Sequence, residues 1–463
     1  MLDKTLGKAE YASHFRSLLE QAEIIDNRYP VEGSYILLPY GLQLKRVLFN
    51  RFRQAFVTSL DASEVELPLR IPQSFLKAHL PPNAPVEESK DFLEQVQLKP
   101  MAHEDSHNEP LFRGALDLGL YQLAIHRVRS YKDLPATYIT QGYTLRSDEG
   151  LPLVRDPEVE FLEGVGLVLP ENKESMLKEL VDLFSDVFKS IGIPVKLLWK
   201  PSFAERFPEN STIKFFTVVP GSTGIISVGI IHYFHNHPTT QFGVQVQQQD
   251  QSLVNPVVFN FAVTQRVLFA FLAHHMDEVG FTLPPSLSPS FITVVPRAKL
   301  PEQAQVKAFF DKILPDSLKP YEFIQAGRKI KETLVRTEIQ GRPLRLEAGL
   351  RDINEGVVQV FARHLNHKTS CEVLQLEHFI SNLTEQVQQA LDDTYDRWQN
   401  IIDEWEKYFP ARALMLCESC QEVVNEESRV LGRLYHTSAR EDTDVCSRCD
   451  QRVASCVFVG EIW

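Results

Sequence analysis

The chain lacks the two features that would direct it into or across a membrane. No apolar run approaches the length of about twenty residues that a membrane-spanning helix needs. No charged segment followed by an apolar one opens the sequence in the manner of a secretory signal. Neither a membrane span nor export is therefore predicted, and we expect a cytoplasmic protein.

Positive charge is also in short supply. The chain holds 48 Lys and Arg against 61 Asp and Glu, a net charge of -13. Phosphate contacts need local positive potential, so an acidic protein that binds nucleic acid must gather its basic residues into one patch. The most basic stretch runs from Arg328 to Arg363 and includes Lys329, Lys331, Arg336, Arg342, Arg345 and Arg351. Two interpretations stay open: an RNA-binding surface, or a solvated face in which acidic residues alternate with the basic ones.

Cysteine is scarce, with 6 in 463 residues, yet four of them form two C-x-x-C pairs. These are Cys417, Cys420, Cys446 and Cys449. Two such pairs can close a tetrahedron of thiolates around zinc, which leaves no open coordination position. Disulfides are the weaker alternative, because nothing marks the chain as secreted and cytosolic thiols stay reduced. We therefore predict structural zinc, and we expect Cys371 and Cys456 to be small buried residues.

What the chain does have is enough apolar sequence for two or three packed domains, since 43% of its residues are hydrophobic. Helical spacing of apolar residues predicts helices over 11–27 and 41–58. Period-two alternation over 152–170 and 213–262 predicts an antiparallel sheet, interrupted by a helix over 175–192. The proline-rich region 77–112 is expected to be an irregular surface excursion.

Proline and serine punctuate the chain again near residues 283–301. The strand, helix, strand order that follows predicts a smaller α/β domain, with a boundary near residue 290.

Two arginines, Arg146 and Arg266, each lie near the edge of an apolar, alternating run. A planar guanidinium with fixed donors suits phosphate oxygens better than a lysine does. Either arginine taken alone is more simply explained as a surface salt-bridge partner. The sequence around them strengthens the interpretation that they bind phosphate.

Three stretches of sequence carry a family resemblance. The run VELPLRIPQSFL places Pro68 as the proline of a first motif, LRSDE contains Arg146 and Asp148 as a second, and VTQRVLFAFLAHH contains Arg266 as a third. Further on, RPLRLEAGLRDINEGVVQVFARH follows, with Leu350 at a position usually held by proline. Together they resemble the class II aminoacyl-tRNA synthetases, and within them the prolyl-tRNA synthetases of the archaeal and eukaryotic type.

The resemblance implies an α+β fold with an antiparallel sheet core flanked by helices. The implied catalytic core covers 1–290, with its motifs near 66–76, 143–162 and 257–285. An α/β anticodon-binding-like domain would follow over 291–400. A C-terminal zinc-ribbon-like domain would occupy 401–463. A homodimer is also expected, because the first motif in this class commonly builds the two-fold contact.

The implied chemistry is ATP-dependent activation of an amino acid, followed by its transfer to tRNA. ATP would bind on the sheet with Mg²⁺, Arg146 holding the α-phosphate and Arg266 the γ-phosphate, while Asp148 orients Arg146 or a metal. Four further residues are expected to bind the amino-acid substrate: Arg113, Asp117, Arg155 and His232. Contacts to tRNA are expected from Arg328, Lys329, Arg345 and Arg351.

The amino-acid pocket departs from the family pattern by losing polar groups. The family's threonine, serine and glutamate are matched by Ala115, Leu116 and Asp117, and its glutamine-glutamate-glycine-histidine run by residues 164–167. Further changes are Pro157 and Val159 in place of arginines, Ala262 in place of a glycine, and Ile230 and Ile231 before the retained His232. Because a buried amine and carboxylate need matched partners, the sequence predicts ATP binding without efficient activation of proline.

Three functions remain open from the sequence. The first is an ATP-dependent ligase acting on proline or on a less polar acyl donor. The second is a catalytically degenerate paralogue that binds RNA, and the third is an assembly subunit whose core serves as a dimer interface. The sequence does not identify the amino acid, and it leaves the tRNA partner as an expectation.

Overall fold

A computed structural model gives the fold of most of the chain. The residues it describes are 6–72, 110–145, 150–201, 211–222, 224–234, 239–240, 243–325, 329–404, 412–415, 430–434 and 456–459. The region 77–112, predicted to be irregular, lies outside the described residues apart from its last three positions. No helix of the described segments has the length and apolar character needed to cross a bilayer.

Two helices and a small hairpin open the described chain. Their bounds are α1 Lys8–Gln21, β1 Ile25–Asp26, β2 Ile36–Leu37 and α2 Pro39–Ser59. The helix predicted over 41–58 is confirmed, and Pro39 favours its start because proline suits the first helical turn. The helix predicted over 11–27 is too long, because Glu23 adopts a positive φ of 51° and β1 then pairs with β2.

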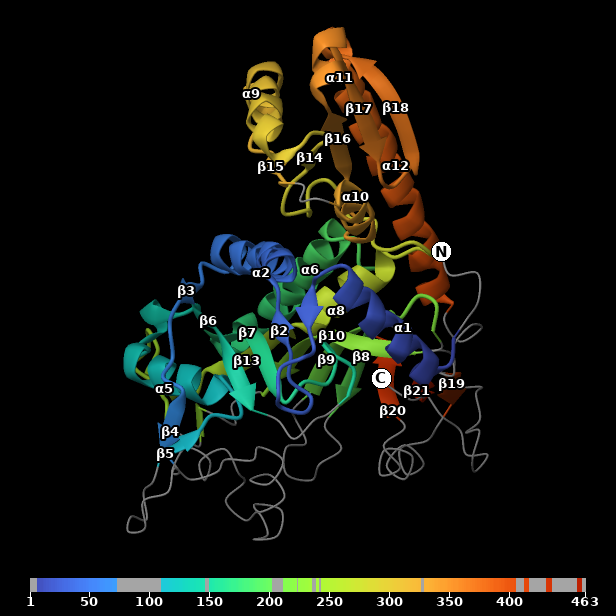
Figure 1. Cartoon of the computed structure of the whole chain (residues 1–463). Coiled ribbons are helices and arrows are strands. Elements are labelled where there is room, and N and C mark those ends of the chain that lie inside the picture. The colour runs from blue at the N-terminus through green and yellow to red at the C-terminus, as the bar shows by residue number, and fades with distance from the viewer. Residues whose placement is uncertain are drawn as a thin grey trace.

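A ten-stranded sheet forms the main body (Figure 1), in the order β19-β21-β20-β8-β9-β10-β13-β7-β6-β3. Every neighbouring pair is antiparallel except β3 and β6, so the predicted antiparallel platform is confirmed. Its strands are β3 Ser63–Glu64, β6 Ala136–Leu145, β7 Glu158–Val168, β8 Lys196–Pro201, β9 Ser211–Val218, β10 Ile225–Tyr233, β13 Val257–Thr264, β19 Arg412–Met415, β20 Val430–Leu434 and β21 Cys456–Val459.

Helices cover the two faces of this sheet unequally. On one face lie α2, α6 (Lys173–Ser190) and α8 (Arg266–His274), sealed by aromatic contacts such as Phe56 to Phe261, with ring centroids 5.0 Å apart. On the other face α5 (Asp117–Arg127) packs with Val165 and Val258. We call this second face the site face.

A second sheet lies beyond the helical layer (Figure 1). Its order is β15-β14-β16-β17-β18, parallel over the first three strands and antiparallel over the last two pairs. Its elements are β14 Ile292–Pro296, α9 Gln303–Ile313, β15 Glu322–Phe323, α10 Ile330–Ile339, β16 Leu344–Ala348, α11 Leu350–Glu355, β17 Val357–Ala362 and β18 His367–Glu372. The alternation of strands and helices agrees with the α/β pattern predicted after residue 290.

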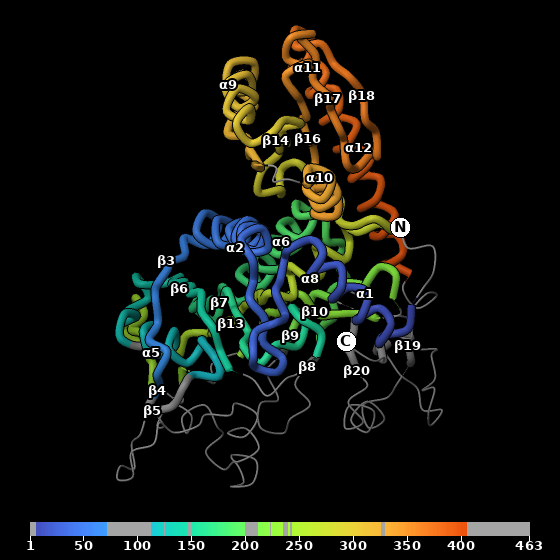
Figure 2. Tube along the Cα trace, in the orientation of Figure 1, coloured from blue at the N-terminus to red at the C-terminus, as the bar shows by residue number. Residues whose placement is uncertain are grey.

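The long helix α12 (Leu376–Asp403) connects the second sheet to the main body, as the trace in Figure 2 shows. Near its start, Leu376 and Ile380 pack in the core of the second sheet. Near its end, Trp398 and Ile402 pack against Leu198 of the main sheet. Because one continuous helix contributes to both cores, it couples the two parts mechanically.

Short elements complete the description. Two small hairpins pair β4 Arg70–Pro72 with β5 Pro110–Phe112, and β11 Val246–Gln247 with β12 Leu253–Val254. The 3₁₀ turns are η1 Tyr131–Asp133, η2 Pro170–Asn172, η3 Leu300–Glu302, η4 Asp316–Leu318 and η5 Val373–Gln375.

Candidate active site

The site face carries two rows of side chains that run across neighbouring strands. Residues directly opposite each other in an antiparallel pair point to the same face, so strand register alone assembles each row. The first row is Thr140, Glu163, Ala262, Ile230 and Lys214. The second row is Tyr138, Val165, Asn260, His232 and Thr212.

Polar contacts tie these rows together. The Asn260 Nδ2 donates to Glu163 Oε1 over 2.7 Å, and both side chains are buried. The His232 Nδ1 lies 2.8 Å from the Thr212 Oγ1. The predicted residue His232 therefore shares a face with a buried carboxylate that the sequence analysis did not select. A signal for it was available, because Glu163 is an acidic residue followed only by glycine and apolar residues to the end of β7.

Arg113 holds the edge of this face together. Its buried guanidinium donates to the carbonyl oxygens of Leu67, Pro68 and Tyr143 at 2.8, 3.0 and 3.3 Å. It lies across Gly142, where a Cβ would collide with it. Burial lowers the pKa of Arg113, and the charge of Glu163 opposes that shift. Arg113 thus fixes the segment around Pro68 against β6 with backbone contacts.

The other two predicted substrate-binding residues differ in exposure. Asp117 is buried at the start of α5, where its carboxylate accepts a hydrogen bond from the Leu118 N–H at 2.9 Å. Arg155 is exposed, beside Gly150. Asp117 is therefore close to the site face of β7, against which α5 packs, whereas Arg155 projects from the loop before that strand.

Arg266 is positioned at one end of the sheet. Its Nε donates to the carbonyl of Val154 over 2.9 Å, and the side chain is half-buried. Beside it, the buried Asp156 accepts hydrogen bonds from the Tyr35 hydroxyl at 2.7 Å and the Gln265 amide at 3.0 Å. Burial raises the pKa of Asp156, and these hydrogen bonds together with the Arg266 charge partly offset the shift.

Arg146 and Asp148 lie outside the described residues, which stop at Leu145 and resume at Gly150. The strand leading to them can still be placed. β6 ends at Leu145, opposite Glu158, and β13 ends at Thr264, opposite Phe161. The two predicted arginines therefore follow strands that end at the same end of the sheet, separated by β7 alone.

A buried ion pair lies on the helix-covered side of the same region. Lys45 of α2 pairs with Glu160, which also accepts a hydrogen bond from Gln141 at 2.7 Å. Burial lowers the Lys45 pKa, but the hydrogen bond and charge of Glu160 outweigh it and raise the pKa overall. Lys45, Glu160, Asp156 and Tyr35 line a cavity of about 160 Å³.

The residues predicted to contact tRNA differ in their exposure. Lys329 and Arg351 are exposed and paired with Glu332 and Glu355 at 2.6 and 2.8 Å. Arg328 lies outside the described residues.

Arg345, which the sequence predicts to contact tRNA, is buried in the described structure. Its side chain is 5% exposed, donates to Glu347 at 3.0 Å and lies over the Phe361 ring. All five residues of β16 are buried, so alternation along this strand does not bring Arg345 to the surface. Arg342 is likewise interior, at 5% exposure.

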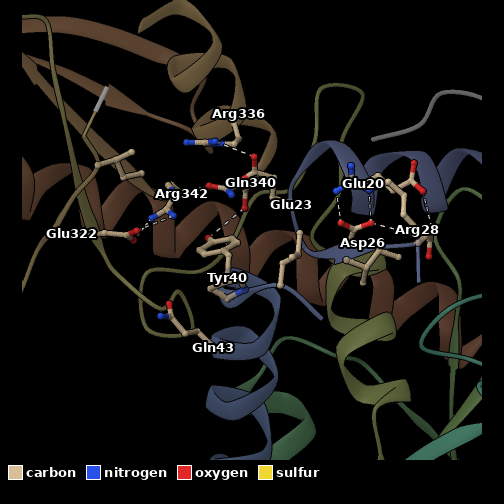
Figure 3. Close-up of a pocket in the computed structure, with 15 residues that line it drawn as sticks. Glu20, Glu23, Asp26, Arg28, Tyr40, Gln43, Glu322, Arg336, Gln340 and Arg342 are labelled. Atoms are coloured by element: carbon tan, nitrogen blue, oxygen red, sulfur yellow. Dashed lines mark hydrogen bonds and ion pairs between the residues drawn. The ribbon is translucent and has the colours of Figure 1, made fainter. Parts of the chain in front are cut away.

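A cavity of about 670 Å³ lies where the main body meets the second sheet (Figure 3). Arg342 stacks over the Tyr40 ring at 4.5 Å and pairs with Glu322. Arg336 pairs with Glu23 across the boundary at 2.9 Å. None of the predicted site residues lines this cavity. The Arg336–Glu23 ion pair and the stacking of Arg342 on Tyr40 join the two parts of the chain.

The four cysteines predicted to bind zinc lie outside the described residues. In the segments that the structure does describe, no group of three or more His, Cys, Asp or Glu is arranged to hold a metal. Cys371 is buried, and burial raises the pKa of its thiol. That position agrees with the expectation of a small apolar residue.

Residues 104–275 match the family model for the tRNA synthetase class II core domain (G, H, P, S and T). Over these residues the chain is similar to a class II tRNA synthetase core. It is 26% identical over 401 residues to a proline--tRNA ligase of Methanopyrus kandleri, covering 83% of this chain and 79% of that one. It is 24% identical over 469 residues to one of Sulfolobus acidocaldarius, covering 95% of each.

Solved structures share the fold of this synthetase-like chain. Giardia lamblia prolyl-tRNA synthetase, in complex with prolyl-adenylate, superposes with a TM-score of 0.80 at 18% identity and full coverage of both chains. The Cryptosporidium parvum enzyme, with halofuginone and AMPPNP, gives 0.83 at 19% identity, covering 100% of this chain and 97% of the other. The resemblance to class II synthetases is confirmed.

Proposed function

We propose that this protein is a prolyl-tRNA synthetase-like ligase, which activates an amino acid with ATP and transfers it to tRNA. The observation that carries the proposal is the place of Arg266, anchored by the Val154 carbonyl at the end of the antiparallel sheet. A guanidinium already fixed by hydrogen bonds is prepared to stabilise charge on phosphates without reorganising.

In this reaction Arg266 binds the γ-phosphate and Arg146 the α-phosphate while the amino-acid carboxylate attacks. Asp148 orients Arg146 or helps to hold Mg²⁺, which supplies charge neutralisation when it is bound with ATP. The strand arrangement supports the pair of arginines, since β6 and β13 flank β7 and end at the same end of the sheet. Residues 1–290 form the catalytic core in this proposal.

The acyl donor binds on the site face, with Arg113, Asp117, Arg155 and His232 near it. We add Glu163 as the group that meets the substrate ammonium, because it is a buried carboxylate on the same face as His232 and is oriented by the Asn260 amide. The walls next to it are apolar at Ala262 and Ile230. Proline remains a poor substrate in this proposal.

The finer assignments follow from the same proposal. The domain over 291–400 contacts tRNA through Arg328, Lys329 and Arg351, and the domain over 401–463 binds zinc through its four thiolates. The working form is a cytoplasmic homodimer. The α/β character of the second sheet supports the domain over 291–400, and the zinc site and the dimer rest on the sequence motifs.

The test is ATP–pyrophosphate exchange measured with each of the twenty amino acids. Arg266→Met should lower the exchange rate roughly 100-fold or more, as loss of one fixed transition-state donor does. Arg129→Met, an exposed arginine outside the site, is the matched control and should keep the wild-type rate. Exchange that survives Arg266→Met refutes the assigned role. A wild-type protein that exchanges with no amino acid would favour the degenerate paralogue instead.

A further inference from the structure

Lys214 occupies a central position on the site face. It lies on β9, between β8 and β10, and is therefore not on an edge strand. The register places it opposite Ile230, which is opposite Ala262, which is opposite Glu163. Lys214 thus belongs to the same row as Glu163, the protein carboxylate proposed to bind the substrate ammonium. Thr212, the partner of His232, lies two positions before Lys214 on the same strand.

The surroundings of Lys214 are poor in anions. Its side chain is half-buried, and the neighbour across the strand is the apolar Ile230. Within the described residues, no carboxylate forms an ion pair with Lys214. Burial lowers the pKa of Lys214 first, and the nearby positive charge of Arg266 lowers it further.

Two cations held near each other in a partly dehydrated site repel one another and lose hydration. Both costs fall when an anion enters between them, since each cation then gains a charge-assisted hydrogen bond. Within the two rows, Glu163 accepts a hydrogen bond from Asn260, and His232 contacts Thr212. Lys214, half-buried and not ion-paired within the described segments, is therefore a cation of the site face that an entering anion would stabilise.

We propose that Lys214, together with Arg266, binds an anionic oxygen group of a substrate on the site face. The group is either a phosphate of the nucleotide or a side-chain carboxylate of the acyl donor, because both present the same charged oxygens. This inference rests on the proposed function, which places ATP and the acyl donor on this face. It makes Lys214 a substrate-binding residue that the motif comparison did not select.

The test is isothermal titration of the wild type, Lys214→Met, Lys214→Arg and the exposed control Lys307→Met. The probes are pyrophosphate as the phosphate source, and aspartate and glutamate against asparagine as the carboxylate source. Lys214→Met should weaken the binding affinity for at least one anionic probe by about tenfold or more, which is the usual effect of losing one charge-assisted contact. Lys214→Arg should stay within a few-fold of the wild type, and Lys307→Met should not differ from it.

The pattern of losses identifies the ligand. Weaker pyrophosphate binding assigns Lys214 to the nucleotide, and weaker aspartate or glutamate binding assigns it to the acyl donor. The proposal is overturned if Lys214→Met binds every probe as the wild type does, or if the wild type binds no anionic probe.

Exchange assays on the same proteins separate this inference from the proposed function. Normal exchange in both the wild type and Lys214→Met, with unchanged titrations, removes the Lys214 proposal alone. Pyrophosphate binding that depends on Lys214, without exchange for any amino acid, removes the ligase alone.

Discussion

Two adjacent buried histidines should make this protein lose stability as the pH falls from 7 to 5. His274 and His275 close α8 and are each 5% exposed. Burial lowers the pKa of His274 to about 3, helped by the charge of His275, and lowers the pKa of His275 to about 4. His274 is held by a contact of 2.8 Å between its Nε2 and the Thr217 hydroxyl, and its ring packs on Trp398.

The sign follows from proton binding. The unfolded chain protonates each histidine below an ordinary pKa of about 6.5, whereas the folded chain resists protonation until far lower pH. Stability is thus fully present above pH 6.5 and is lost as the pH falls toward the folded pKa values. pH 5 lies above both folded pKa values. Between pH 7 and pH 5 each histidine should therefore lower the free energy of unfolding by about 2 kcal/mol, or about 4 kcal/mol for the pair.

The assay is urea unfolding of the wild type and of the double variant His274→Gln, His275→Gln at both pH values. The double variant should be less stable at pH 7, yet most of its pH dependence should be gone. His378→Gln, an exposed histidine on α12, is the control and should keep the wild-type pH dependence. An equal loss between pH 7 and pH 5 in the wild type and the double variant would refute the assignment.

Three further predictions concern other parts of the molecule. Arg363→Met should destabilise the chain by about 3–5 kcal/mol in denaturant unfolding, because it leaves the partly buried carboxylate of Asp277 without its cation. The guanidinium contacts that carboxylate at 2.7 and 2.8 Å. Adding Asp277→Asn should restore part of the lost stability. Gly164→Ala should cost about 1–3 kcal/mol, since its Cβ would come within 2.4 Å of the Phe261 ring, and a melting temperature equal to the wild type would contradict this packing. Metal analysis should find one zinc ion per chain, and none after all four predicted thiolates are changed to serine.

Local patterns predicted the elements whose periodicity is strong. The helix over 41–58 and the alternating strands appeared with small errors at their ends, and the second sheet begins at Ile292, close to the expected boundary. Local spacing did not predict which polar residues are buried in a strand that is covered on both faces. Arg345 is the clearest case, because β16 is buried on both faces and its charges are neutralised inside.

The site rows could not be predicted from the sequence because they depend on register between distant strands. Glu163, Asn260 and Lys214 belong to three strands, and only the pairing of β7, β13, β10 and β9 brings them onto one face in two neighbouring rows. A motif identifies positions such as Arg266 through resemblance. It does not reveal a residue, such as Lys214, that matters through its cross-strand neighbours.

The C-terminal strands have a consequence for how this sheet is protected. β20 pairs with β8, with Leu434 opposite Leu198. Without this pairing, β8 would be an edge strand of the main sheet. An unpaired edge strand exposes backbone N–H and C=O groups, which can pair with a strand of another protein molecule and so promote self-association. Pairing with β20 therefore removes β8 from the edge of the sheet and leaves the short strand β19 as the edge in its place.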